Sequence, residues 1–244
     1  VIFRSIVLPL SVGAVFVAAT VTYLGWWRPV LRESEPGTPK WAMWIVLVAM
    51  AAFSVNMMLA TDWSAVTPTH LMLLVVSGIL VGFNEETVNR GVTVTGLRGS
   101  RFNETWVALG SAFLFGAMHV PNAMFGVPLV ATLAQGVFAF IMGCGFYVLR
   151  RVSGSLAITM VLHGLWDFST FSNQASGADA AYALYFQFGA YLIALIALFA
   201  VLRRSESYHD RVEEGRLADG FRQVGGHAPR NRCRARARRG RRRP

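Results

Sequence analysis

The segment Gly82-Phe83-Asn84-Glu85-Glu86-Thr87-Val88-Asn89-Arg90-Gly91 directly follows an apolar run, residues 71–81, with the composition of a membrane helix. Charged side chains in such a helix are costly, at roughly 2.5–3.5 kcal/mol each on insertion scales. If the helix continues, Glu86 and Arg90 lie four residues apart on one face and form an ion pair. Glu85 then points about 100° away around the helix and is free for another task. The alternative is that these charges only end a helix at the water interface.

The composition indicates a membrane protein with several spans. The chain has 244 residues, of which 54% are hydrophobic, and its mean hydropathy is +0.45. These values are not typical of a soluble domain. The net charge of +10 is concentrated at one end: residues 1–202 carry nine Lys or Arg and eight Asp or Glu, whereas residues 203–244 carry fourteen Arg and five acids. The two cysteines have no zinc-type spacing.

Apolar segments of spanning length predict an all-α, polytopic transmembrane helix bundle with about seven spans. A cleaved signal peptide is the alternative for the first span, but only Arg4 precedes it and no clear cleavage site follows it. We therefore expect an uncleaved helix and a multi-pass integral protein of the cell membrane. The expected spans are residues 6–24, 41–60, 70–90, 106–120, 129–149, 156–171 and 183–202.

Positive charge alternates along the connections between these spans. Residues 28–40, 91–104 and 150–151 are basic, whereas the other three connections contain no Lys or Arg. The positive-inside rule then predicts an outside N-terminus and a cytoplasmic C-terminus. Two parts are expected: a transmembrane domain at 1–203, and a basic, disordered cytoplasmic tail at 204–244.

The end of the tail is the most basic part of the chain. Nine of the fifteen residues in 230–244 are Arg, and none is acidic. Such a segment cannot form a core, so we predict that it is disordered. Its expected partner is anionic membrane lipid, because it follows directly on a span. Nucleic acid has similar electrostatics but is the less expected partner, and an inert solubilising tail is the other alternative.

Away from the span ends, the ionisable side chains of the apolar segments are few. They are Glu85, Glu86, His119, His163 and Asp167, and three spans supply them. Charged groups in membrane helices almost always face the bundle interior and pair there. We therefore predict one polar pocket between these spans. The alternatives are a buried structural His163–Asp167 pair, a His119 that lies at the membrane surface, and a proton relay.

The order of these residues resembles the CPBP family of intramembrane proteases, which contains the type II CAAX prenyl endopeptidases and the bacteriocin-processing or immunity (Abi) proteins. The three matching motifs lie within residues 70–171 and are Glu85-Glu86-x-x-x-Arg90, Phe115-x-x-x-His119 and His163-x-x-x-Asp167. Members of the family cleave peptide bonds near or within the membrane.

The resemblance implies catalytic roles for six residues. Glu85 and His119 would activate the attacking water, while His163 and Asp167 would line the oxyanion site. Glu86 and Arg90 would orient Glu85 and brace the helix. The last motif of the family often ends in Asn. The Asp167 found here cannot donate to an oxyanion when ionised, so it is either protonated or orients His163.

A metal is the second possible mechanism. One Glu and two His, here Glu85, His119 and His163, match the ligand count of catalytic zinc sites. However, the sequence has no His-Glu-x-x-His motif, and the three ligands come from separate helices. We favour a metal-free, glutamate-activated water and expect no cofactor.

These observations favour an intramembrane endopeptidase whose substrate is a membrane-associated protein or peptide. A non-catalytic immunity or scaffold protein of the same fold is the first alternative. A proton-coupled transporter is the second, although the chain shows no inverted repeat. Nothing in the sequence indicates whether the substrate is prenylated.

Overall fold

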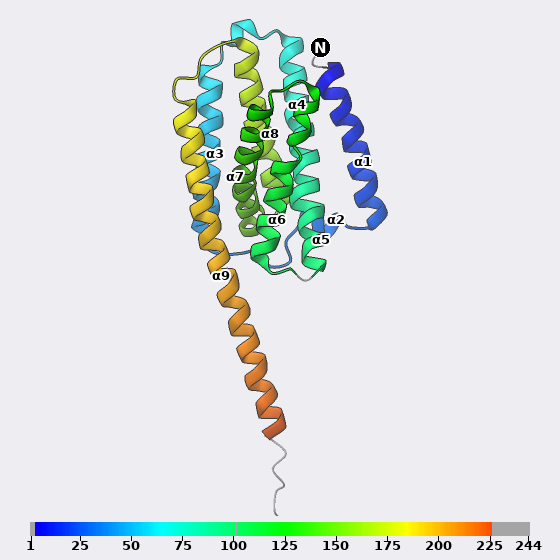
Figure 1. The fold of residues 1–244 in the computed structure, drawn as a ribbon, viewed down its shortest axis with the longest axis vertical. Helices are drawn as coiled ribbons and strands as arrows, with labels where there is room; N and C mark the ends of the chain where they lie inside the picture. The colour runs from blue at the N-terminus through cyan, green and yellow to red at the C-terminus, as the bar shows by residue number, and fades with distance from the viewer. Residues whose placement is uncertain (1–2, 101, 226–244) are drawn as a thin grey trace, which may run out of the picture. The chain divides into compact units, whose positions relative to one another are not determined.

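The computed structural model describes residues 3–100 and 102–225, with side chains as far as Ser205. Within these ranges the chain forms helices and no β-strand (Figure 1). It divides into two compact units, Val1–Glu206 and Ser207–Pro244, and the first unit contains the helical bundle. The predicted all-α membrane bundle is confirmed.

Long helices joined by short helical turns make up the bundle. In chain order the elements are η1 (Phe3–Val7), α1 (Leu8–Leu24), α2 (Trp27–Leu31), α3 (Lys40–Ala60), η2 (Trp63–Ala65), α4 (Pro68–Glu86), η3 (Thr87–Thr93), α5 (Val94–Gly99), α6 (Glu104–Ala117), η4 (Val120–Phe125), α7 (Leu129–Ser153), α8 (Leu156–Ser176) and α9 (Ala183–Gly225).

Six helical stretches in the described part of the chain are long and apolar enough to cross a membrane. The predicted span at 156–171 forms α8, which has 21 residues but is not among the six. Polar side chains such as His163, Asp167 and Asn173 interrupt its apolar sequence. The number of spans and the placement of the termini therefore stay predictions. The six stretches are Phe3–Leu24, Lys40–Ala60, Pro68–Gly99, Glu104–Phe125, Leu129–Ser153 and Ala183–Ser205.

The connection predicted at 91–104 is wrong over most of its length. The helix that contains the Glu pair continues through η3, which is π-helical, and through α5 to Gly99. Gly91 does not break this helix but lets α2 approach, because a Cβ atom there would lie 2.7 Å from Val30 Cγ1. The helix ends only at Gly99, and α6 begins at Glu104, where the side chain of the preceding Asn103 accepts a hydrogen bond from the Trp106 amide.

The short connection between α5 and α6 determines how deep Glu85 and His119 lie in the bundle. Glu85 and His119 lie at about equal distances along the chain from the turn, on either side of it. Two helices joined by a short turn run antiparallel, so both residues come to the same depth of the bundle. A longer loop at 91–104 would have left them far apart.

Glycines let α4 and α8 pack backbone against backbone. A Cβ atom on Gly78 would lie 2.6 Å from the Gly164 carbonyl oxygen, and one on Gly164 would lie 2.5 Å from that of Gly78. At Gly82 a Cβ atom would collide with the Met160 carbonyl oxygen. Small residues at helix interfaces permit such approach in membranes. The contact places the Glu pair beside His163.

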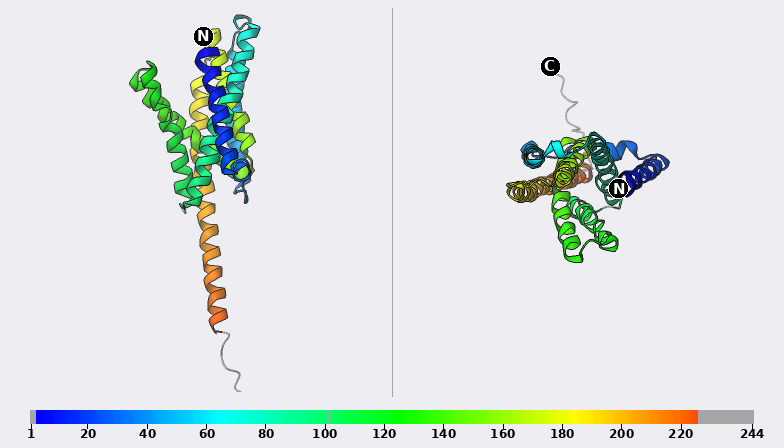
Figure 2. Two further views of the ribbon diagram at one scale, coloured as in Figure 1. Left: turned by 90° about the vertical axis from the view of Figure 1, so that its right-hand side faces the viewer. Right: turned by 90° about the horizontal axis from the view of Figure 1, so that it is seen from above.

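Figure 2 shows α6 and the first part of α7 leaning away from the other helices toward the end that holds η4. The helix α1 lies at the edge of the bundle against α4 (Figure 1), and only 11% of the span that contains it is buried. The first part of α9 lies at the opposite edge, near α3.

The tail differs from its prediction where the structure describes it. The helix α9 continues through Gly225, so residues 204–225 are helical rather than disordered. No proline interrupts the chain between residues 203 and 225, and an uninterrupted helix propagates more easily than it starts. The segment 230–244, predicted to be disordered, lies outside the described residues.

A cluster of charged side chains joins the loop after α2 to three helices. Arg98 donates to Glu33 across 2.7 Å and also to Glu104. Arg150 Nε lies 3.3 Å from the second oxygen of Glu33, and Arg151 Nε lies 3.2 Å from Glu104. The Glu33 side chain is 3% exposed, so this buried carboxylate depends on its cationic neighbours.

Candidate active site

Glu86, Arg90 and His163 form a buried hydrogen-bonded group. Arg90 Nη1 lies 2.9 Å from Glu86 Oε1, and neither side chain is exposed. His163 Nδ1 lies 2.8 Å from the same oxygen. An ionised carboxylate only accepts hydrogen bonds, so Nδ1 of His163 carries a proton. The predicted Glu86–Arg90 pair is present, but the described contacts of Glu86 run to His163 and not to Glu85.

The other imidazole nitrogen of His163 faces two carboxylates. Its Nε2 lies 3.8 Å from Glu85 Oε2 and 3.9 Å from Asp167 Oδ2. Both separations are too long for direct hydrogen bonds. They leave these polar atoms free to bind a water or a substrate oxygen beside them. The Glu85 and Asp167 side chains are 18% and 22% exposed, so this side of His163 is the accessible one.

Two aromatic rings hold the cationic partners of Glu86 in place. Phe146 stacks on the His163 ring with centroids 4.6 Å apart, and the Phe115 ring meets His163 edge-on at 5.5 Å. The Arg90 guanidinium carbon lies 4.0 Å from the Phe115 centroid, a cation–π distance. The arrangement fixes the His163 ring plane and explains why α6 contributes a phenylalanine here.

His119 lies just beyond the end of α6 and begins the turn η4. Its Nδ1 lies 2.8 Å from the Phe115 carbonyl oxygen. A carbonyl oxygen accepts, so Nδ1 carries the proton and Nε2 of a neutral His119 holds a lone pair. The Phe115 ring meets the His119 ring edge-on at 5.2 Å. This histidine is thereby oriented by the residue four positions earlier.

Glu85, His119, His163 and Asp167 all line one cavity with a volume of about 470 Å³. The sequence predicted one pocket for these four residues and Glu86; the four line the cavity, and Glu86 does not. Glu86 and Arg90 lie behind His163 and do not line it. The other residues of the wall are Val81, Phe115, Met118, Asn122, Gln135, Ala139, Met142, Phe146, Trp166, Thr170, Phe171, Gln174, Gln187 and Tyr191.

Sequence reasoning missed much of this wall. Nothing in the sequence marks Phe146 as a site residue, because it is one of many aromatic residues in apolar segments. The sequence could have pointed to Gln135 and Gln187, since each is an isolated carboxamide within a predicted span. Polar residues in such positions mark functional sites in membrane proteins.

Glu85, His119 and His163 are the residues that would hold a metal in the alternative mechanism. Within residues 3–100 and 102–205, no three His, Cys, Asp or Glu side chains form a group that could hold a metal ion. The Nδ1 atoms of both histidines are engaged with Phe115 and Glu86. Glu85, His119 and His163 all line the same cavity, and the metal-free mechanism stays a prediction.

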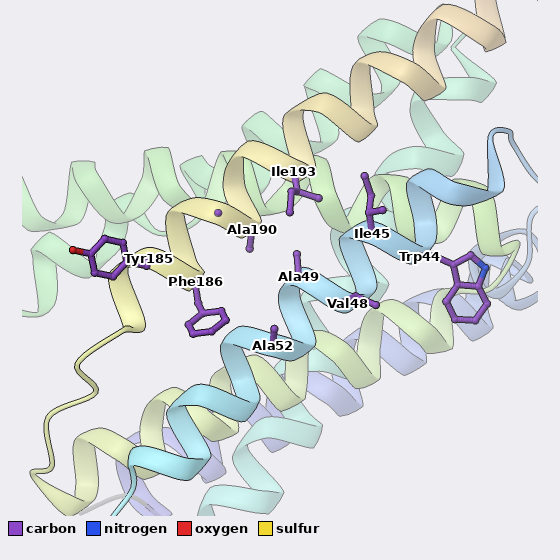
Figure 3. Close-up of a pocket in the computed structure, with 10 residues that line it drawn as sticks. Trp44, Ile45, Val48, Ala49, Ala52, Tyr185, Phe186, Ala190 and Ile193 are labelled. Carbon is purple, nitrogen blue, oxygen red and sulfur yellow. The ribbon is translucent and has the colours of Figure 1, made fainter.

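A second cavity, of about 490 Å³, lies between α3 and the first part of α9 (Figure 3). Its wall is almost wholly apolar, with Trp44, Val48 and Ala52 from α3 and Phe186 and Ile193 from α9. None of the described residues in this wall is an acid or a histidine. Of these two cavities, only the first is lined by carboxylates and histidines.

The segment from α4 to α8 that builds the first cavity matches a protein family. The family model is described as type II CAAX prenyl endopeptidase Rce1-like, and the match covers residues 67–169. Residues 67–169 are thus similar to this Rce1-like family. The three motifs that carried the resemblance to the CPBP proteases all fall within it, so the predicted relationship is confirmed. No curated protein and no solved structure shows a significant match to the chain.

The Rce1-like family is a protease family, which supports a peptide hydrolase built into a membrane helix bundle. The Rce1-like segment holds every acid and histidine of the cavity wall. The helices before α4, together with α9, lie outside the match and complete the bundle around it.

Proposed function

We propose that the chain is an intramembrane endopeptidase of the cell membrane that hydrolyses a peptide bond in a membrane-associated protein or peptide. The observation that supports this most directly is the approach of Glu85 to His163 at the wall of the cavity, 3.8 Å apart. A carboxylate and an imidazole at this spacing can act on one water and one carbonyl group at the same time.

In this mechanism Glu85 is the general base. A water beside Glu85 gives one proton to the carboxylate while its oxygen attacks the scissile carbonyl carbon. The Nε2 lone pair of His119 accepts a hydrogen bond from the second hydrogen of the water and so holds the oxygen in line. General-base catalysis of this kind contributes typically 10²–10⁴-fold to the rate.

His163 stabilises the tetrahedral intermediate. With Nδ1–H donating to Glu86, a proton on Nε2 makes the ring an imidazolium that donates to the new oxyanion. Asp167 lies close enough to Nε2 to favour this charged form and the ring orientation. This resolves the departure from the Asn usual in the family, because Asp167 then acts through His163 and need not donate.

Collapse of the intermediate completes the reaction. The carbon–nitrogen bond breaks, and protonated Glu85 gives its proton to the leaving amine. The products are a peptide with a new carboxyl terminus and a peptide with a new amino terminus. Glu85 returns to the carboxylate form, so no external acid, oxidant or metal is consumed.

The test is cleavage of an internally quenched, randomised peptide pool by the purified full chain in detergent. Glu85→Gln keeps the size of the side chain and removes the base, so we expect at least 10²-fold slower cleavage. The unfolding temperature of this variant should match that of wild type. Wild-type cleavage that survives a metal chelator would support the metal-free mechanism, and its loss and restoration by zinc would refute it.

Two other outcomes would favour the alternative functions, and a third would exclude the proposed base. A wild-type protein that binds peptides without cleaving them would support an immunity or scaffold role. Equal cleavage by wild type and Glu85→Gln would exclude Glu85 as the base. Proton flux in vesicles without peptide hydrolysis would favour a transporter.

A further inference from the structure

Four carboxamide side chains line the first cavity. They come from four different elements: Asn122 from η4, Gln135 from α7, Gln174 from α8 and Gln187 from α9. Segments far apart in the sequence thus bring the same chemical group to one wall. Nothing in the proposed chemistry of Glu85, His119 and His163 uses them.

These carboxamides retain free hydrogen-bonding capacity. Asn122 donates to Gln135 Oε1 across 3.0 Å, which leaves both amide hydrogens of Gln135 for other acceptors. Gln187 donates to the Tyr191 hydroxyl across 2.7 Å and keeps its carbonyl oxygen. A carboxamide offers two donors and one acceptor group. The wall therefore presents amide donors and carbonyl acceptors together, as a peptide main chain does.

A peptide bond can be attacked only where the main chain of the substrate is unwound. Unwinding in a membrane leaves amide and carbonyl groups without partners, at several kcal/mol each in hydrocarbon. Side chains that both donate and accept can satisfy these groups for any residue type. Uncharged carboxamides do this without the additional desolvation cost of an ion.

We propose that Asn122, Gln135, Gln174 and Gln187 form a subsite that binds the main chain of an extended, uncharged substrate segment next to the scissile bond. This inference rests on the proposed endopeptidase function and assigns the substrate class of the same cavity. Among the described residues of its wall, none is Lys or Arg, whereas Glu85 and Asp167 are acidic. A free C-terminal carboxylate therefore gains no ion pair, and the subsite does not require one.

The experiment measures binding without hydrolysis. The full-length Glu85→Gln protein is titrated into a fluorescein-labelled pool of ten-residue peptides randomised over Ala, Ser, Thr, Val and Leu, and anisotropy gives the affinity. The pool is made in three forms: with a C-terminal amide, with a C-terminal acid, and with N-methylated amide bonds. N-methylation removes main-chain donors and leaves the side chains unchanged.

We expect N-methylation to weaken binding about threefold to tenfold, the range for the loss of a single hydrogen bond. Gln135→Leu with Gln187→Leu should weaken binding of the unmodified pool similarly and abolish most of the effect of N-methylation. Asn56→Leu is the matched control, since Asn56 is a carboxamide of α3 that does not line the cavity. The acid and amide pools should bind equally.

Equal binding of the methylated and unmodified pools would overturn the subsite, as would tighter binding of the acid pool by tenfold or more. Unfolding temperatures identify a variant that fails to fold. In that case the Gln174→Leu variant is used instead, because Gln174 is exposed and its replacement disturbs the fold less. Failure of the two proposals is distinguishable. A subsite that responds to N-methylation in a chain that never cleaves refutes the enzyme alone, whereas cleavage with no methylation effect refutes the subsite alone.

Discussion

His163 contacts Glu86 through Nδ1 at 2.8 Å and faces Glu85 through Nε2 at 3.8 Å. The carboxylates of two consecutive residues thus lie near opposite nitrogens of one imidazole ring, because neighbouring residues on a helix point about 100° apart. One is buried and structural, and the other lines the cavity. The division explains why the pair occurs together and why the two residues are not interchangeable.

The buried ion pair predicts a specific pattern of stability. Arg90→Ala should lower the free energy of unfolding by about 3–5 kcal/mol, because it leaves Glu86 charged and unpaired in the interior. Glu86→Gln combined with Arg90→Met leaves no isolated charge and should be clearly more stable than Arg90→Ala alone. Thermal unfolding in detergent measures both. A double variant as unstable as the single one would mean that Arg90 stabilises by packing on Phe115.

The same double variant separates stability from catalysis. Its fold should recover, but the carboxylate that favours the charged form of His163 is gone, so we expect kcat to fall about 10²-fold. KM for the quenched peptide pool should change little, because Glu86 and Arg90 do not line the cavity. Near-normal kcat in this variant would show that Glu86 has no part in the chemistry.

Gly82→Ala should disrupt the α4–α8 contact. The added methyl group meets the Met160 carbonyl oxygen, which is backbone and cannot rotate away. Overpacking of this kind costs typically 1–3 kcal/mol, and the shift should also separate Glu85 from His163 and reduce cleavage. Gly96→Ala is the control, because nothing lies within 4 Å of a Cβ atom there. Equal unfolding temperatures for the two variants would contradict this packing.

The arginine-rich segment 230–244 stays a prediction. Deleting it should leave peptide cleavage intact, because the cavity is built from residues 81–191. A synthetic peptide of this segment should bind anionic vesicles and not neutral ones, with an affinity that falls as salt is added. Co-sedimentation measures both. Equal binding to the two vesicle types, or loss of cleavage on deletion, would refute the assignment.

Local rules predicted part of this site well. The four-residue spacing predicted the Glu86–Arg90 pair, and apolar length located the start of each long helix within a few residues. The spacing did not predict the contact between Glu86 and His163. That contact depends on how closely Gly78, Gly82 and Gly164 let α4 and α8 approach. Three glycines after Arg90 suggested a loop, whereas tertiary packing at Gly91 keeps the helix intact.

The charged cluster at Glu33 is completed late in synthesis and membrane insertion of the chain. Glu33 and Arg98 leave the ribosome long before Arg150 and Arg151, so the early helices are synthesised before the partners that complete their charge balance. The loop after α2 can reach its final position only when α7 has been inserted. A nascent chain that stops short of α7 thus lacks two of the three arginines that surround the Glu33 carboxylate.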